Sequence, residues 1–525
     1  MVQDPSYGEE LHLTIARVLN SETGEVRQRF SQYTDVDHSL EEGWEVDYSS
    51  TGNVFTEKEV AYCVSVPGQN QWAQLESTAS IESALEALSI TNTSPHTNGN
   101  VDSGDTADSG FEVASGLASK YPLPGENHTA ALVKFYSPSA APKASSVIDV
   151  VGIYELGYNS KSQESDEERK VLWPCIHAIY YTDIQLHNLV PSLPRLALSA
   201  YIARRDMCLS HLTLVLGGDE LAAQYLLLHL LSKSVRVQDA KVGKFSLNLI
   251  GVPSCEKKQQ QQQKEQSRRF NFNNLATKWI GDAIAQLVPC SVELPFELGL
   301  LNRSAFLPNA EHGDLKAGVL QLAPGTEIIC DETCLHEGTL DEHGVRNLHA
   351  LQTSILEQTV TYLYPFQPID ISTNLRILVL STGKSILQND CDVYLADTAV
   401  RFFAKIQSGT SVDMQPLDPM HTEQIRQYLE LARCLDFNIP KDVSDIISSE
   451  YADSRRCAHK NGEQMMTQED LALTVTVARL ISISKGQDVL DLASWREACT
   501  LEQYRKERAT KAKSARPASG GEPSS

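Results

Sequence analysis

Apolar and polar residues alternate along the first part of the chain, which predicts β-strands. The alternation is clear over residues 11–15 and again over 60–66. Two more alternating runs, 130–136 and 147–154, predict two strands joined by a loop. Short strands with glycine turns are typical of small barrels. We therefore expect a β-rich N-terminal part of the oligonucleotide/oligosaccharide-binding (OB) type.

Near Leu212 the pattern changes into apolar runs that alternate with helical segments. Residues 212–216 predict a buried strand that ends at Gly217-Gly218. Residues 221–231 are apolar nearly all round, which predicts a buried helix. Further strands are predicted at 245–250, 327–330 and 375–380. Strands that alternate with helices indicate an α/β domain built on a largely parallel, three-layer sheet.

After the α/β pattern, apolar positions recur with the 3.6-residue period of helices, as they do over 425–435. Thr467 is placed to cap a helix over 471–483, and Gly486 is placed to end it. A last helix is predicted from about 492 to 506. We therefore expect a helical C-terminal domain.

Polar, low-complexity stretches divide the chain. Residues 91–117 have the composition of a linker, and residues 256–269 form a Gln-rich insert typical of a surface excursion. The predicted parts are a β-rich region at 1–85, a disordered linker at 86–120, an OB-like segment at 121–195, an α/β domain at 196–400, a helical domain at 401–506 and a basic disordered tail at 507–525. The basic residues around the last boundary fit either a nuclear-import signal or a solvated chain end.

Composition and charge narrow the possible functions. Lys and Arg number 45 against 68 Asp and Glu, which gives a formal net charge of −23. Such a surface repels phosphate backbones, so we do not expect the whole chain to bind nucleic acid nonspecifically; a basic protein partner or a local basic patch stays open. The 11 cysteines contain no C-x-x-C pair, and no signal peptide or membrane span is visible. We expect a reduced, soluble, intracellular protein.

The turn at Gly217-Gly218-Asp219-Glu220 stands where a phosphate-binding loop would stand, between a predicted strand and a helix. A phosphate-binding loop also needs a Lys for the outer phosphates and a Ser or Thr hydroxyl for Mg²⁺, and neither is present. The two acids suit the positive end of the helix dipole. We therefore interpret this turn as the capped start of a core helix.

Two further segments resemble parts of ATPase sites. Asp331 and Glu332 follow an apolar strand, as acids that orient Mg²⁺ and water do, but such a pair is weak evidence without a phosphate-binding Lys. Residues 381–385 contain Gly-Lys-Ser, yet the spacing and the order along the chain do not fit a phosphate-binding loop. We interpret 381–385 as an ordinary turn.

Cys330, Cys334, His336, His343 and His349 are candidate metal ligands, because the two cysteines have a spacing that zinc tolerates. Cys330 lies inside an apolar strand, where a buried thiol is usual. We therefore expect no bound metal. We also expect no cofactor, no small-molecule substrate and no catalytic residues, because no complete set of catalytic residues can be assembled from the sequence.

An ordered series of short motifs resembles the minichromosome maintenance (MCM) complex-binding protein family. The motifs are residues 62–68, 121–126, 151–154, 218–226, 243–249, 318–322, 329–333, 340–345 and 484–487, followed by Trp495. Family members look as though they begin further upstream. The region 1–85 is therefore expected to be truncated, through either an incomplete gene model or a shortened natural isoform.

That family is itself similar to the MCM helicase subunits, which implies a degenerate AAA+ domain at 196–400. Gly218-Asp219 looks like a Walker A region without its Gly-Lys-Ser core, and Asp331-Glu332 looks like the Walker B acids. Where a sensor Asn is expected the chain has Ser381 and Thr382, and the Ser-Arg-Phe finger has no counterpart. The resemblance implies a scaffold that does not hydrolyse ATP.

The function implied by the resemblance is binding of MCM subunits in the nucleus, and through them chromatin, during DNA replication, the cell cycle and sister chromatid cohesion. The chain would regulate MCM assembly or unloading. Two alternatives stay open. One is an OB-fold protein that binds single-stranded nucleic acid, for which Tyr154 and Tyr158 are candidate stacking platforms. The other is an active AAA+ ATPase.

Overall fold

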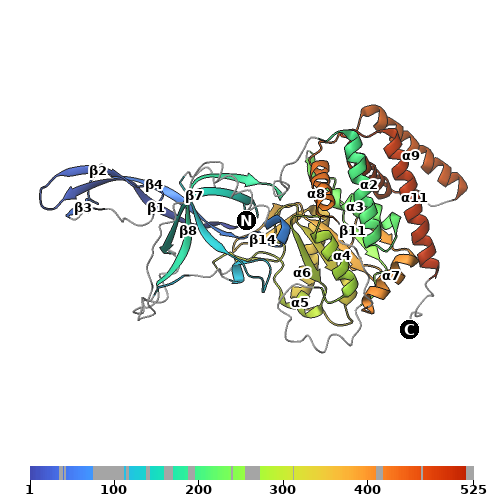
Figure 1. Ribbon diagram of the computed structural model, residues 1–525, viewed down its shortest axis with the longest axis horizontal. Helices are drawn as coiled ribbons and strands as arrows, with labels where there is room; N and C mark the ends of the chain where they lie inside the picture. Colours follow the sequence, from blue (N-terminus) through green and yellow to red (C-terminus); the bar gives the residue numbers. More distant parts are fainter. Residues whose placement is uncertain are drawn as a thin grey trace.

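The computed structural model describes residues 1–34, 40, 43–74, 111–113, 118–136, 142–158, 170–186, 196–237, 240–254, 272–310, 313–409, 418–462 and 465–515. The fold is mixed α/β, with a curled sheet at the N-terminal end and a helical C-terminal region (Figure 1). The Gln-rich insert predicted at 256–269 lies outside the described residues. Among the described helices, none has the length and apolar character needed to cross a bilayer.

The curled sheet is built from five long strands. They are β1 (Val2–Asn20), β4 (Val54–Val64), β6 (Ala130–Phe135), β7 (Val147–Tyr158) and β8 (Lys170–Ile184). The sheet runs β1-β4-β6-β8-β7, and all neighbours are antiparallel except the parallel pair β6-β8. Backbone hydrogen bonds between Val2 and the start of β7, from Val2 N to Ser146 O at 2.9 Å and from Ser145 N to Val2 O at 2.8 Å, bring the first strand back to the last.

Strands from two predicted parts, 1–85 and 121–195, therefore belong to one curled sheet. The predicted linker 86–120 lies mostly outside the described residues, but its end differs from the prediction. Phe111–Val113 (β5) pair with β8 in parallel, and Lys120 is buried with its Nζ 3.4 Å from Asp4 Oδ2. Long-range pairing has incorporated these residues into the fold, which local composition could not indicate.

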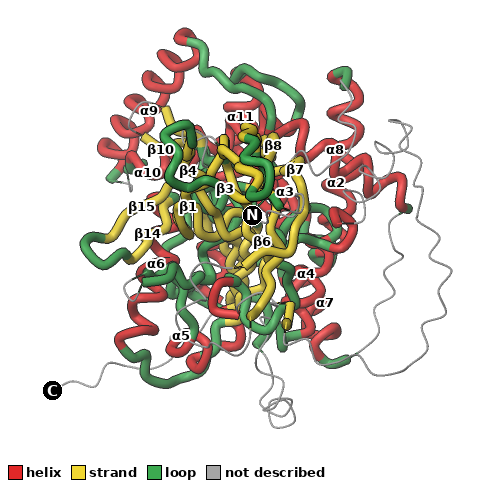
Figure 2. The backbone as a smooth tube through the Cα atoms, turned by 90° about the vertical axis from the view of Figure 1, so that its left-hand side faces the viewer, coloured by secondary structure: helices red, strands yellow, loops and turns green. Residues whose placement is uncertain are grey.

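The outer half of β1 and its partners form an arm that projects from the curled sheet (Figure 1). Its other strands are β2 (Val26–Phe30), β3 (Trp44–Val46) and the first half of β4. β2, β3 and β4 each pair with β1 in antiparallel fashion. Figure 2 faces this side of the molecule and shows the strands in the middle of the view with helices around them.

The α/β part contains a five-stranded sheet in which every pair is parallel. Its order is β12 (Ser291–Pro295), β13 (Glu327–Asp331), β16 (Arg376–Ser381), β11 (Leu247–Ile250) and β17 (Cys391–Tyr394). The helices of this part are α4 (Leu275–Ala285), α5 (Leu298–Arg303), α6 (Glu342–Glu357) and α7 (Asp397–Gln407). The strands predicted at 245–250, 327–330 and 375–380 and their parallel arrangement are confirmed.

The strand predicted at 212–216 is wrong. These residues form the last turn of helix α2 (Leu198–Val215) and its C-cap, Leu216. Leu212 and Val215 are buried, whereas Leu214 is 66% exposed, which is the alternation of a helix with one covered face. An apolar run of five residues cannot by itself distinguish a strand from a buried helix segment.

The helix predicted at 221–231 is confirmed as α3 (Glu220–Leu231), in which nearly every residue is buried. In the C-terminal region lie α8 (Pro419–Arg433), α9 (Lys441–Asn461), α10 (Gln468–Ser484) and α11 (Leu492–Ala515). The predicted Thr467 cap is present as a capping box with Asp470. Helix α11 continues past the predicted end, so residues 507–515 of the expected disordered tail are helical.

One hydrophobic core joins the curled sheet to the parallel sheet. Tyr62 and Trp173 of the curled sheet belong to the same buried cluster as Leu294 and Val379 of the parallel sheet. Ser145 Oγ also lies 3.0 Å from the hydroxyl of Tyr362, which belongs to the two-stranded sheet of β14 (Thr359–Leu363) and β15 (Pro368–Ser372). The short pair β9 (Val235–Val237) and β10 (Ala240–Val242) completes the strands.

Candidate functional site

Asp331, the first acid of the predicted pair, ends β13 and is fully buried. Its Oδ2 accepts a hydrogen bond from the Thr277 hydroxyl at 2.8 Å and one from Cys334 Sγ at 3.4 Å. Its Oδ1 accepts from Thr333 twice, from the backbone N–H at 2.9 Å and from the hydroxyl at 2.6 Å. Burial raises the pKa of Asp331, and these hydrogen bonds oppose that rise. Protein donors therefore occupy both oxygens.

Thr277 reaches Asp331 because helix α4 begins beside the carboxyl end of β13. Asn274 caps α4 by accepting from the Ala276 N–H at 2.8 Å. The Asn274 amide Nδ2 also donates to the Pro253 carbonyl and to the Thr333 hydroxyl, each at 2.7 Å. The chain thus passes from β11 through a loop, part of which lies outside the described residues, into a helix whose first turn contacts the buried acid.

Glu332, the second acid, is bound by a different segment. Ser385 Oγ donates to Glu332 Oε1 at 2.6 Å, and the Ile386 N–H donates to Oε2 at 3.4 Å. Burial raises the pKa of Glu332 to about 7, although the hydrogen bond from Ser385 opposes the shift. The Gly-Lys-Ser segment at 381–385 therefore supplies a hydroxyl to the acid.

The other predicted motif, Gly218-Asp219, joins two helices and not a strand to a helix. Gly217 and Gly218 have φ values of +64° and +89°, which residues with a Cβ rarely adopt. Asp219 caps α3 by accepting from the Ala222 N–H at 3.1 Å, and it also accepts from the Ala396 N–H at 2.7 Å. The capping role expected for this turn is present, but the preceding strand is absent.

Asp219 also binds helix α11. Arg508 Nη1 lies 2.7 Å from both carboxylate oxygens of Asp219. A cavity of about 850 Å³ adjoins this ion pair and is lined by α3, α11 and the loop before α7. The two predicted motifs thus lie in different networks, since Asp219 contacts α11 whereas Asp331 contacts α4.

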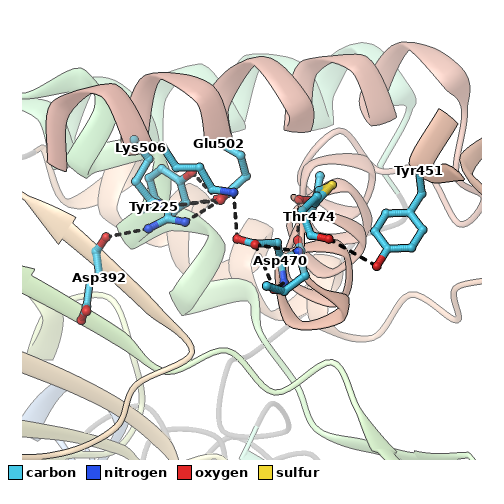
Figure 3. Close-up of polar contacts among 10 residues, drawn as sticks. Tyr225, Asp392, Tyr451, Asp470, Thr474, Glu502 and Lys506 are labelled. Carbon is cyan, nitrogen blue, oxygen red and sulfur yellow. Dashed lines mark hydrogen bonds and ion pairs between the residues drawn. The ribbon is translucent and has the colours of Figure 1, made fainter. Parts of the chain in front are cut away.

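Helix α11 is fixed by a second set of polar contacts, some of them buried (Figure 3). Glu502 accepts from the Tyr225 hydroxyl at 2.6 Å and from Arg505 Nη2 at 2.7 Å, and Arg505 Nη1 donates to the Asp392 carbonyl at 3.1 Å. Lys506 Nζ donates to Asp470 Oδ1 at 2.8 Å. These contacts tie α11 to α3, β17 and α10. A cavity of about 680 Å³ lies between α9, α10 and α11.

A buried ionic network that the sequence did not reveal lies at the opposite end of β13. Glu327 is fully buried, with Oε1 2.6 Å from His229 Nε2 and Oε2 2.8 Å from Arg376 Nε. Burial acts to raise the pKa of Glu327, but the combined effect of His229 and Arg376 is larger and lowers the pKa to about 2. An acid in an apolar strand was the only signal, and it does not identify its partners.

The candidate metal ligands do not lie together in one place. Cys330 and Cys334 are buried around the end of β13, whereas His343 and His349 lie on α6. Cys334 Sγ donates to Asp331. Among the residues that the structure describes, no three His, Cys, Asp or Glu side chains gather as a metal site would require.

Fold and site together define a mixed α/β protein whose buried acids at the strand ends are held by the protein's own donors. Hydrogen bonds to these acids connect helices to the parallel sheet, as Thr277 of α4 and His229 of α3 do with Asp331 and Glu327 of β13. The chain belongs to the mini-chromosome maintenance replisome factor family, whose model matches residues 1–105 and 90–509.

Curated relatives carry the name mini-chromosome maintenance complex-binding protein. The Salmo salar protein is 31% identical in an alignment that covers 98% of this chain and 88% of the relative. The Gallus gallus protein is 29% identical, with 97% and 87% covered, and the Drosophila melanogaster protein is 27% identical, with 97% and 88% covered. The resemblance given by the short motifs is thereby confirmed.

Proposed function

We propose that this chain binds MCM helicase subunits as a non-catalytic partner and acts as a subunit-like scaffold during MCM assembly or unloading from chromatin. The observation that carries the proposal is the likeness over nearly the whole chain to proteins named for binding the MCM complex. In this role the chain acts in the nucleus during DNA replication. Its contact with chromatin is indirect, through the MCM subunits.

The proposed scaffold contains a degenerate AAA+ site, which we place at the β11–α4 junction and not at Gly218-Asp219. In a phosphate-binding loop, a strand leads through the loop to a helix, and a Lys precedes the hydroxyl residue that binds Mg²⁺ together with an acid from another strand. Here β11 leads to α4, and the Thr277 hydroxyl meets Asp331. The residue before Thr277 is Ala276, which has no charge to offer a phosphate.

The contacts of Asp331 support a scaffold over an ATPase. A carboxylate that coordinates Mg²⁺ needs free lone pairs and an open path to solvent. Asp331 is fully buried and accepts four hydrogen bonds from Thr277, Thr333 and Cys334. We infer that Asp331, which corresponds to a Mg²⁺-binding acid of active ATPases, here holds α4 on the sheet through its hydrogen bond from Thr277. A subunit-shaped surface would then face a neighbouring MCM subunit without contributing to the motor.

The curled sheet supports an OB-type assignment within this proposal. The strand order β1-β4-β6-β8-β7, with β1 returning to β7, supports this assignment, because an OB fold is a small, partly open barrel of five strands. The barrel would then draw on both 1–85 and 121–195, and not on 121–195 alone. Of the two tyrosines considered as stacking platforms, Tyr154 is 64% exposed, and Glu155 lies next to it.

The proposal is tested with purified full-length chain and individually purified MCM subunits. We expect at least one subunit to co-elute with the chain in size-exclusion chromatography. If no subunit or subcomplex co-elutes at micromolar concentrations, the proposed function is wrong.

A separate titration tests the non-catalytic part. Calorimetry with Mg²⁺-ATP should give no micromolar dissociation constant, because Ala276 replaces the phosphate-binding Lys. The matched variant Ala276→Lys reports whether this position alone prevents binding, with Leu275→Lys, one residue earlier on α4, as the control. Micromolar binding of ATP to the unchanged chain would contradict the scaffold proposal and favour the ATPase alternative.

A further inference from the structure

The projecting arm carries an apolar face that the described part of the chain leaves exposed. A β-bulge interrupts the pairing of β1 with β4 between Leu13 and Ile15, but residues 12, 16 and 18 of β1 are buried, which leaves 11, 13 and 15 for this face. Cross-strand pairing places Phe55 opposite Leu13 and Phe30 opposite Ile15. Leu11 and Phe30 are each 73% exposed, and Phe55 is 53% exposed. The opposite face of β1 is different, since His12, Ala16 and Val18 are buried there.

The arm face exposes several large apolar side chains close together. Its two phenylalanines, at these exposures, leave roughly 250 Å² of aromatic surface in water. Leu11 and the partly exposed Leu13 and Ile15 extend it. Contiguous patches beyond a few hundred Å² are uncommon on monomers, and each partner in a stable dimer covers about 800 Å².

Charges at the two ends of the arm face indicate which occupant fits. Glu9 lies toward the curled sheet and Arg17 toward the tip, each four residues from Leu13 on the same face of β1. Both side chains are exposed. Glu57, which pairs with Leu11, adds a second acid at the sheet end. The arm face is thus apolar in the middle and acidic at one end, and its other end carries Arg17, next to which lies Asp47, whose N–H donates to the Arg17 carbonyl at 2.9 Å.

A second copy of the same face, turned antiparallel about a twofold axis through Leu13, matches this pattern. Glu9 then meets Arg17 of the copy, and Leu11 meets its Ile15, so each favourable pair occurs twice, as an isologous interface requires. A parallel arrangement would place Glu9 on Glu9 and Arg17 on Arg17, which like-charge repulsion opposes. The complementarity is local, in a chain whose formal net charge is −23.

We propose that the arm face is a self-association surface, through which two copies of this chain stack their arms antiparallel about Leu13. The arm projects away from the rest of the molecule (Figure 1), so the face is accessible to the second copy. The proposal does not rest on binding of MCM subunits, and it concerns a surface separate from the β11–α4 junction.

The test measures the mass of the full chain by sedimentation velocity across micromolar concentrations. The unchanged chain should form dimers, and Arg17→Glu should weaken them at least about tenfold, because it places acid on acid at both ends of the interface. The double variant Glu9→Arg with Arg17→Glu restores opposite charges and should return the dissociation constant to within about threefold. Leu11→Glu should also separate the copies.

Leu214→Glu on α2 is the matched control, since Leu214 is 66% exposed but lies outside the arm. It should leave the dimer intact, and all variants should keep the melting temperature. A chain that stays monomeric at every concentration overturns the proposal, and so does a double variant that dimerises no better than Arg17→Glu. Loss of a bound MCM subunit from a monomeric chain on Leu11→Glu would assign the face to that subunit and likewise overturn self-association.

Discussion

Arg508 Nη1 lies 2.7 Å from both carboxylate oxygens of Asp219, although the two residues are 289 positions apart. The Asp219 side chain is fully buried, whereas that of Arg508 is 28% exposed. The ion pair therefore links the turn that begins α3 to the last part of α11. The turn that resembles a phosphate-binding loop in sequence is a docking point for the C-terminal helix.

Asp219→Ala should lower the free energy of unfolding by about 2–5 kcal/mol, because it removes a helix cap and leaves Arg508 without its buried partner. Urea denaturation measures the change. Lys513→Ala, an exposed basic position on the same helix, is the control and should stay within about 0.5 kcal/mol. In a double-mutant cycle with Arg508→Ala, additive effects of the two substitutions would contradict the proposed coupling.

Leu227→Ala should cost about 2–5 kcal/mol, because Leu227 is 1% exposed in the middle of α3 and truncation leaves a cavity. Leu214→Ala, on the neighbouring helix but 66% exposed, should cost much less. Both are compared by urea denaturation, and co-elution with MCM subunits is measured on the folded fraction. Equal losses of stability for the two variants would show that α3 is not a central core element.

The stability of the fold should depend on pH through Glu332. Burial raises its pKa from the ordinary 4.5 of a glutamate to about 7, so the folded state binds the proton more tightly than the unfolded state does. Stability then falls as pH rises from 4.5 to 7, by about 3 kcal/mol in total. Glu332→Gln should therefore be more stable than the unchanged chain at pH 8 and similar to it near pH 5. Glu337→Gln, at an exposed position nearby, is the control substitution.

Glu327 should change the stability of the fold with pH in the opposite direction to Glu332, by lowering the free energy of unfolding in acid. His229 and Arg376 lower its pKa from the ordinary 4.5 of a glutamate to about 2 in spite of burial, so its contribution to stability is fully present above pH 4.5 and is lost as pH falls toward 2. The loss should reach about 3 kcal/mol. Glu327→Gln should be destabilised by about 3–5 kcal/mol at pH 7, because Arg376 is left buried without its partner, and its acid dependence should be shallower. A slope identical to that of the unchanged chain between pH 5 and pH 3 would refute this assignment.

Sequence patterns predicted helices and strands best where an apolar run was bounded on both sides by clear turn residues. Helix α3 and the strands β11, β13 and β16 followed from apolar runs bounded by clear turns. The run 212–216 did not, because five apolar residues at the end of a helix resemble a buried strand. That error moved the expected phosphate-binding position to Gly218, whereas Thr277 and Asp331 meet at α4. Little in the sequence marks the start of α4 beyond Asn274 as its cap.

The sequence by itself determined the mixed α/β class of the fold, the helices α3, α8, α10 and α11, and the family. Each of these rests on local pattern or on motif order, which the linear chain carries. Tertiary structure alone decided that Arg508 binds Asp219, that Thr277 binds Asp331 and that Glu327 joins His229 to Arg376. These partners are far apart in sequence, and they meet because packing of the sheet and helices brings together polar groups whose burial without a partner would be costly.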